Sequence, residues 1–234
     1  MDLKLNPDFL HKVCYRSTFR TSFLQLSAYR GLGLISCLLQ LGIVWYFWWP
    51  QVHKPLYYLT IWGNLMLAIY LLLALICSKH SNPTLERANH LLYQATAPTL
   101  VLIMIFFWTA LLPFFLLMLE QDPDHFWFHL VLNVGLHFIT PLFGALEIYY
   151  NQVCVKPKDT LLVCGVLALV YMTVNYYATI AEGAPIYPPV DWETYLTPVS
   201  IAFALLLEYL GYYVVRKIWM YKVVAQMTVT SKKE

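Results

Sequence analysis

Two short stretches of this chain carry side chains that could perform nucleophilic catalysis. Thr60 and Asn64 are spaced four residues apart, as are Asn133 and His137, so a helix would place each pair on one face. A threonine hydroxyl is a weak nucleophile until an adjacent base removes its proton, and a neutral imidazole is such a base. The pattern therefore predicts Thr60 as nucleophile and His137 as base. Asn64 or Asn133 would donate to a developing oxyanion, or hold the imidazole in one tautomer.

The same side chains have a second interpretation, in which they only join helices. Polar and small residues recur at steps of four and three along one stretch, namely Asn133, His137, Thr140, Gly144 and Glu147. Such a stripe faces the interior of a helix bundle, where an interhelical hydrogen bond contributes about 0.6 kcal/mol. Depth also separates the two candidate residues, since Thr60 lies ~6 Å and His137 ~12–16 Å into their helices. Tilt of the helices, or unwinding near Gly135 or Pro141, would have to bring them together.

The composition is that of an integral membrane protein. Of the 234 residues, 60% are hydrophobic and 12% are charged, whereas soluble proteins average about 25% charged residues. The net charge of +2 is small and gives no indication of nucleic-acid binding. The five cysteines form no CxxC pair, and their odd number does not suggest a disulfide framework, which indicates buried thiols.

Six apolar stretches predict an all-α fold of six transmembrane helices, because about twenty apolar residues cross a bilayer. They are Gly31–Pro50, Leu56–Ser78, Ala97–Leu119, Phe126–Tyr150, Thr160–Ala181 and Leu196–Val215. The polar stretch Lys79–Thr96 is interpreted as a loop, and Pro113 is expected to kink the third span. Residues 1–30 would form a basic segment with an interfacial helix, residues 31–215 the membrane domain, and residues 216–234 a basic tail.

The basic residues predict the orientation of the chain in its membrane. Fourteen of the fifteen Lys and Arg residues lie in the two terminal segments and in the second–third and fourth–fifth loops, whereas Lys54 alone lies on the other side. By the positive-inside rule both termini face the cytosol, or the matrix if the membrane is mitochondrial. We expect the endoplasmic reticulum or the plasma membrane, with the mitochondrial inner membrane as the alternative.

A metal site and an ion path are weaker hypotheses. His125 and His129 are spaced to chelate a metal, but no carboxylate–histidine cluster accompanies them, so no metal or other cofactor is predicted. Two deep carboxylates, Glu147 and Glu208, could form a proton or ion path. Alternatively, a basic residue at the end of the sixth span, Arg216 or Lys217, would pair with one of them.

Three motifs give the chain a resemblance to a known family. They are Tyr58-Leu59-Thr60-Ile61-Trp62-Gly63, Leu132-Asn133-Val134-Gly135-Leu136-His137 followed by Pro141, and Ile186-Tyr187-Pro188-Pro189-Val190-Asp191-Trp192. In these motifs the chain resembles the androgen-induced-gene and androgen-dependent TFPI-regulating proteins, and still more their rolling-stone relatives. Six spans with both termini inside also fit, so the similarity covers nearly the whole chain.

The resemblance implies an integral-membrane threonine hydrolase of fatty acid esters of hydroxy fatty acids. The family's catalytic Thr and His map onto Thr60 and His137, while Val134 stands where the androgen-induced members carry a further histidine. Its partners would be bilayer lipids and a lipid ester that enters sideways from the bilayer, and no cofactor is required. The alternative is a non-catalytic accessory subunit, or a structural or fusion component, of a larger membrane assembly with membrane-protein partners.

Overall fold

The computed structural model describes residues 22–121, 123–151 and 153–230, and within these residues it contains helices and no strand. Most of the predicted interfacial segment, residues 1–21, lies outside the described residues. The elements are α2 (Phe23–Phe47), η2 (Lys54–Tyr57), α3 (Leu59–Lys79), α4 (Pro83–Phe106), η3 (Phe107–Leu111), α5 (Leu112–Gln121), η4 (Pro123–His125), α6 (Phe126–Val134), η5 (Gly135–Ile139), α7 (Thr140–Tyr150), α8 (Pro157–Glu182) and α9 (Leu196–Thr230).

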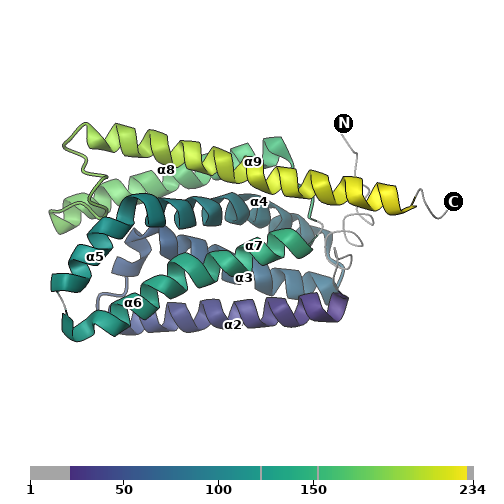
Figure 1. Ribbon diagram of the computed structural model, residues 1–234, viewed down its shortest axis with the longest axis horizontal. Coiled ribbons are helices and arrows are strands. Elements are labelled where there is room, and N and C mark those ends of the chain that lie inside the picture. Colours follow the sequence, from purple (N-terminus) through teal and green to yellow (C-terminus); the bar gives the residue numbers. More distant parts are fainter. Residues whose placement is uncertain (1–21, 122, 152, 231–234) are drawn as a thin grey trace.

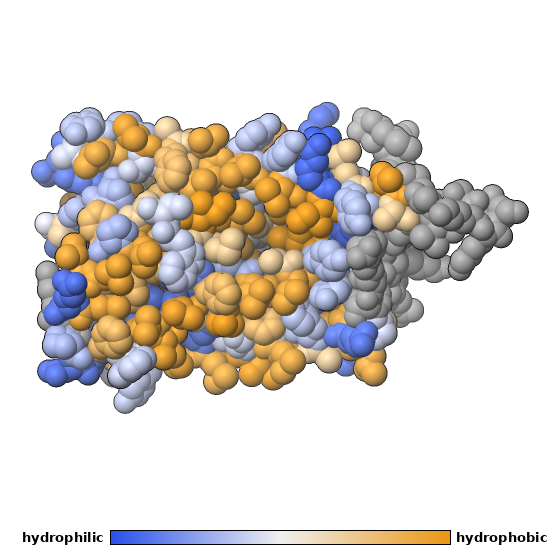
Figure 2. Space-filling model, in the orientation of Figure 1, coloured by the Kyte–Doolittle hydropathy of each residue, from blue (hydrophilic) through white to orange (hydrophobic). Residues whose placement is uncertain are grey.

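Six helical segments are long and apolar enough to cross a membrane, which confirms the all-α, multi-pass prediction. They are Phe23–Phe47, Leu59–Lys79, Pro83–Leu117, Pro123–Tyr150, Pro157–Glu182 and Leu196–Ala225. They lie side by side in one bundle, and the start of α2 and the end of α9 lie at the same end of it (Figure 1). The face in Figure 2 is mostly hydrophobic along the middle of the bundle, and hydrophilic residues gather toward its two ends.

The first span begins earlier than hydropathy predicted. The Gln25 backbone N–H donates to Ser22 Oγ at 3.2 Å, and the Ser22 N–H donates to Gln25 Oε1 at 2.9 Å. This capping box fixes the helix start at Phe23. Arg30 therefore lies inside α2, where it is fully buried, and not in the basic segment predicted to precede the span.

The prediction that residues 79–96 form a polar loop is wrong for most of that stretch. Asn82 Oδ1 accepts the backbone N–H groups of Thr84 and Leu85 at 3.0 and 3.2 Å, and Pro83 occupies the first helical position. This N-cap starts α4 fourteen residues before the predicted span. Likewise α9 continues to Thr230, so the residues predicted as a basic tail are helical up to that point.

Helix α4 lies at the centre of the bundle, packed against α3, α7, α8 and α9. Helices α4 and α9 approach each other closely at Gly211. A Cβ built at Gly211 would lie 2.7 Å from the Pro98 carbonyl oxygen and 3.2 Å from Val101 Cβ. The two backbones thus approach as closely as they do because residue 211 has no side chain, in the manner of small residues between membrane helices.

Substituting Gly211 with alanine is expected to destabilise the bundle by about 1–3 kcal/mol, because the added methyl meets backbone that cannot rotate away. Gly165→Ala is the matched control. A Cβ there meets nothing within 4 Å, so this helical glycine should gain about 0.5–1 kcal/mol. Thermal unfolding in detergent measures both. Equal melting temperatures for the two variants would contradict the close α4–α9 contact.

Candidate active site

The third and fourth spans are each interrupted by a short π-helix just before a proline. Segment η3 precedes Pro113 and segment η5 precedes Pro141. A proline lacks the N–H that would bond to the carbonyl four residues earlier, and its ring clashes with that carbonyl. At these points the helix widens to a π-helix, in which a backbone N–H bonds to the carbonyl five residues earlier. Such π-helical turns are often found at functional sites. The expected kink at Pro113 therefore takes the form of η3, on its N-terminal side.

Segment η5 positions His137 against η3. Because Pro141 has no N–H, the His137 carbonyl is free to accept the Trp108 indole Nε1–H at 3.3 Å. The His137 imidazole stacks on the Phe107 ring, with 3.6 Å between centroids and 8° between planes. The two π-helices thus fix both the backbone and the ring of His137.

Thr60 and His137 line the same cavity, which has a volume of about 50 Å³. Both residues are nearly enclosed, with 8% and 6% of their surfaces exposed. The other lining residues come from α3, α4, η3, α8, α9 and the loop before α9, and they are Leu59, Leu102, Ile103, Phe106, Leu111, Tyr171, Met172, Tyr187, Val190, Ser200, Ile201 and Ala204. This volume exceeds the ~10–15 Å³ that one water molecule needs.

Helix lengths explain how two residues at different sequence depths reach one cavity. The second span has 21 residues, whereas the third and fourth have 35 and 28. At 1.5 Å per residue the longer helices extend beyond the first turn of α3. Thr60, in that first turn, therefore lies beside residues that are several turns from the ends of the third and fourth spans. The π-helix at His137 adds the local unwinding expected near Gly135 or Pro141.

Two tyrosine hydroxyls cap the N-terminus of α3 beside Thr60. The Leu59 N–H donates to the hydroxyl oxygens of Tyr171 and Tyr187, at 3.1 and 3.0 Å. The Tyr171 hydroxyl donates onward to the Tyr57 carbonyl at 3.0 Å. Burial raises the pKa of Tyr187, although hydrogen bonds with Tyr171, Leu59 and Thr60 oppose the shift. Tyr187 therefore keeps its proton and can donate it into the cavity.

The two predicted asparagines do not line this cavity. Asn64 Nδ2 donates to the Cys37 carbonyl at 3.5 Å, and its Oδ1 accepts from Thr140 Oγ1 at 3.4 Å, so Asn64 joins α3 to α2 and α7. Asn133 Nδ2 donates to the His129 carbonyl of its own helix at 2.9 Å. In this structure both amides are directed to helix packing and backbone contacts.

The polar groups that the sequence reasoning missed are Tyr171, Tyr187 and Ser200. Tyr187 belongs to the Ile186–Trp192 motif, one of the three that carry the family resemblance, but the motif gave no chemical role to any of its residues. Ser200 also lines the cavity, but its Oγ donates to the Pro189 carbonyl at 2.6 Å. Nδ1 of His137 is buried without a hydrogen-bond partner, so no side chain of the described residues orients the imidazole through that atom.

The deep carboxylates have different partners from those predicted. Glu147 Oε1 lies 2.6 Å from Arg30 Nη2 and also accepts the Tyr70 hydroxyl at 2.7 Å. Arg216, one of the two predicted partners, instead donates to the Tyr212 hydroxyl at 3.0 Å. The hypothesis that Arg216 or Lys217 pairs with Glu147 or Glu208 is therefore wrong for the described residues. Arg30, which the early start of α2 brings to that depth, pairs with Glu147, and the ion pairs found there do not include Glu208.

The residues suggested as metal ligands lie close together at the start of the fourth span. The rings of His125 and His129 are 6.3 Å apart and nearly perpendicular. No group of three or more His, Cys, Asp or Glu side chains suited to a metal occurs among residues 22–121, 123–151 and 153–230.

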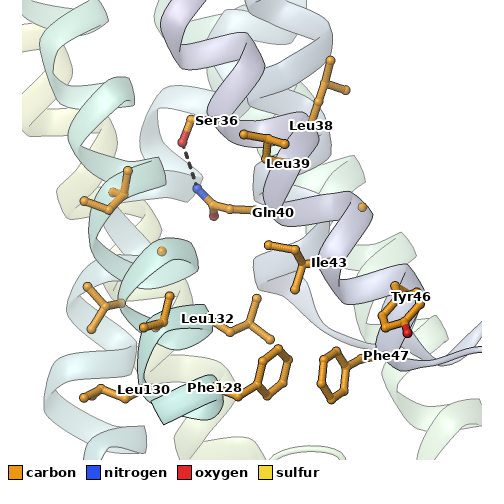
Figure 3. A pocket seen from close by; sticks show the side chains of 15 residues that line it. Ser36, Leu38, Leu39, Gln40, Ile43, Tyr46, Phe47, Phe128, Leu130 and Leu132 are labelled. Atoms are coloured by element: carbon orange, nitrogen blue, oxygen red, sulfur yellow. Dashed lines mark hydrogen bonds between the residues drawn. The ribbon is translucent and has the colours of Figure 1, made fainter.

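A large hydrophobic groove of about 1010 Å³ runs between α2 and the α6–η5 segment. Figure 3 shows Phe47 and Phe128 at one end of it, where their rings stack with centroids 3.6 Å apart. Its main polar side chains are Gln40 and Ser36, joined by a 3.1 Å hydrogen bond. Gly135 lines this groove while His137 lines the inner cavity, so one π-helix borders both.

Compared with models of protein families, with curated proteins and with solved structures, the chain matches none of them.

Proposed function

We propose that this protein is an integral-membrane hydrolase that cleaves lipid esters, with Thr60 as nucleophile and His137 as base. The observation that supports the proposal is the shared cavity: a hydroxyl-bearing and an imidazole-bearing side chain from different spans line one apolar, nearly closed space. The resemblance described above favours fatty acid esters of hydroxy fatty acids as substrates. The membrane would be that of the endoplasmic reticulum or the plasma membrane, with both termini in the cytosol.

The reaction would proceed through an acyl-threonine. His137 takes the proton of the Thr60 hydroxyl as Oγ1 attacks the ester carbonyl. The C–O bond to the alcohol then breaks, and the imidazolium returns the proton to the departing oxygen. In the second half, His137 takes a proton from water, the resulting hydroxide attacks the acyl carbon, and Thr60 leaves as a hydroxyl. The fatty acid and the free enzyme are the products, and no metal or organic cofactor takes part.

Tyr187 replaces the asparagines as the proposed oxyanion donor. Its hydroxyl is beside Thr60 at the N-terminus of α3, and its Oη already accepts the Leu59 N–H, which leaves its proton for the substrate. The positive end of the helix dipole lies at the same point and favours negative charge on the carbonyl oxygen. The hydroxyl and the helix end together supply the stabilisation that a tetrahedral intermediate needs.

Tyr187→Phe is therefore expected to lower kcat by about 10²–10³-fold, the usual cost of one oxyanion donor, with KM little changed. Helix α3 keeps its cap in this variant because the Leu59 N–H still reaches Tyr171. Tyr177→Phe is the control, since Tyr177 is exposed on the outside of the bundle and should turn over like the wild type. Steady-state ester hydrolysis in proteoliposomes checks both variants. A Tyr187→Phe enzyme with full kcat would remove Tyr187 from the mechanism.

The hydrophobic groove provides a lateral route for the substrate. Its lining is almost wholly apolar, and it lies along η5, the segment that carries His137. A lipid tail lying in this groove stays in hydrocarbon surroundings while the ester approaches the π-helix. The ester then has no need to leave the bilayer before it reaches the cavity.

The experiment that tests the proposal is fluorophosphonate labelling of the purified protein, followed by mass spectrometry of the labelled peptide, together with turnover of ester lipids in vesicles. We expect the label on Thr60 and release of free fatty acid. Absence of both in a well-folded sample would reject the hydrolase. Stable co-purification with other membrane proteins would then favour the accessory-subunit alternative.

A further inference from the structure

A second cavity of about 50 Å³ lies between α4, α8 and α9, next to the Thr60–His137 cavity. The two cavities share five lining residues, namely Leu59, Leu102, Tyr171, Met172 and Ala204. The polar side chains of the second cavity gather around Thr99, Cys164 and Glu208. A cavity of this size has room for water.

Glu208 has an unused hydrogen-bonding atom in this cavity. Its Oε1 accepts the Thr99 hydroxyl at 3.0 Å, and the Cys164 thiol lies within hydrogen-bonding reach of the carboxyl group. Its Oε2 is buried without a nitrogen or oxygen partner. The ion pairs found in the described part of the chain, such as Arg30–Glu147, do not include Glu208. A carboxyl group in an apolar slab costs least in its neutral form, which offers one donor and further acceptor sites. Such a group is well suited to bind water.

Polar contacts continue from this cavity toward the loop between α7 and α8. Cys164 Sγ lies 3.6 Å from the Gln94 carbonyl oxygen. The Gln94 side chain donates to the Cys154 carbonyl at 2.7 Å and accepts the Lys156 N–H at 3.1 Å. Both of these residues belong to the α7–α8 loop, which lies at the opposite end of α8 from the loop that carries Tyr187. Polar contacts therefore follow the α4–α8 interface from the α7–α8 loop to Cys164, which lines the second cavity together with Glu208.

We propose that Glu208 holds water in the second cavity and supplies it to the Thr60–His137 cavity past Tyr171. The inference rests on the proposed function, whose second step consumes one water molecule in a space otherwise walled by apolar side chains. The water oxygen ends in the fatty acid, and its protons go to the acid and, through His137, to Thr60. Glu208 gains and loses no net proton, so it is a positioning residue and not a catalytic one.

The first test separates the two halves of the reaction. In Glu208→Leu, acylation of Thr60 by an activated ester should keep its wild-type rate, while steady-state turnover falls about tenfold and acyl-threonine accumulates in the mass spectrum. Glu208→Gln, which still hydrogen-bonds water, should stay within about threefold of the wild type. Leu206→Ala, on the outer face of α9, controls for substitution on that helix. Unchanged turnover in Glu208→Leu would overturn the inference and leave the hydrolase intact.

The second test does not depend on activity. A short X-ray pulse makes hydroxyl radicals from bound water, which then oxidise neighbouring side chains. We expect Cys164 and Met172 to be oxidised in the wild type and severalfold less in Glu208→Leu, whereas Met104, on a lipid-facing surface, should not differ. Equal oxidation of Cys164 and Met172 in the two proteins would overturn the water site. If oxidation falls in Glu208→Leu but the wild type shows no ester turnover, the hydrolase would be rejected and the water site would stand.

Discussion

Replacing Thr60 with alanine is expected to abolish fluorophosphonate labelling and to lower ester-lipid turnover by roughly 10⁴-fold or more, the scale on which nucleophile removal acts. The protein should remain folded, because the change removes one hydroxyl and one methyl group from a cavity wall and costs about 1 kcal/mol. The measurement is turnover at matched protein concentration, with the melting temperature recorded for each sample. Loss of turnover without loss of fold distinguishes a nucleophile from a residue that only joins helices.

Three further variants make this prediction specific. Thr60→Ser keeps the hydroxyl and should keep the label and measurable turnover. His137→Ala should lose as much activity as Thr60→Ala, and the double variant should lose no more than either, because groups that act as a unit are not additive. A Thr60→Ala protein with wild-type turnover would contradict the mechanism. Independent, multiplicative losses would show that the two side chains do not act in one step.

The six spans could be predicted because each is a run of about twenty apolar residues. That Thr60 and His137 line one cavity could be anticipated in part. Pro141 marked the place where the fourth span departs from a regular α-helix, and the structure has η5 there. The π-helical form and the stacking of His137 on Phe107 could not be predicted. The stacking also depends on the third span, where the π-helix η3 before Pro113 carries Phe107 to the His137 ring.

The roles of Asn64, Asn133 and Tyr187 could not be predicted from spacing. Positions four apart share a helix face, but which neighbouring helix that face meets depends on how the whole bundle packs. Asn64 therefore bonds to Thr140 instead of facing the cavity, and Tyr187 reaches Thr60 from a loop more than a hundred residues away. The boundary errors have a different cause. A boundary predicted from hydropathy falls at the first polar or charged residues. The helix itself begins or ends at its capping residue, as α4 begins after Asn82.

The second large effect is expected at the buried ion pair between Arg30 and Glu147. Their side chains are 0% and 1% exposed, and Glu147 also accepts the Tyr70 hydroxyl and Asn151 Nδ2, at 2.7 and 3.2 Å. Removing one partner of a buried pair leaves a charge without its counter-ion and typically costs about 3–5 kcal/mol. Glu147→Leu should lower the free energy of unfolding by that amount, which denaturant unfolding in mixed micelles would measure.

The double variant Arg30→Met/Glu147→Leu removes both charges and should recover most of the lost stability, because a well-packed apolar pair can equal a buried ion pair. Glu182→Gln is the surface control. Glu182 pairs with Lys54 at 2.6 Å, but both side chains are partly exposed, so this variant should cost no more than about 1 kcal/mol. A double variant as unstable as Glu147→Leu would show that the geometry of the Tyr70 and Asn151 hydrogen bonds, and not the unpaired charge, holds α2, α3 and α7 together.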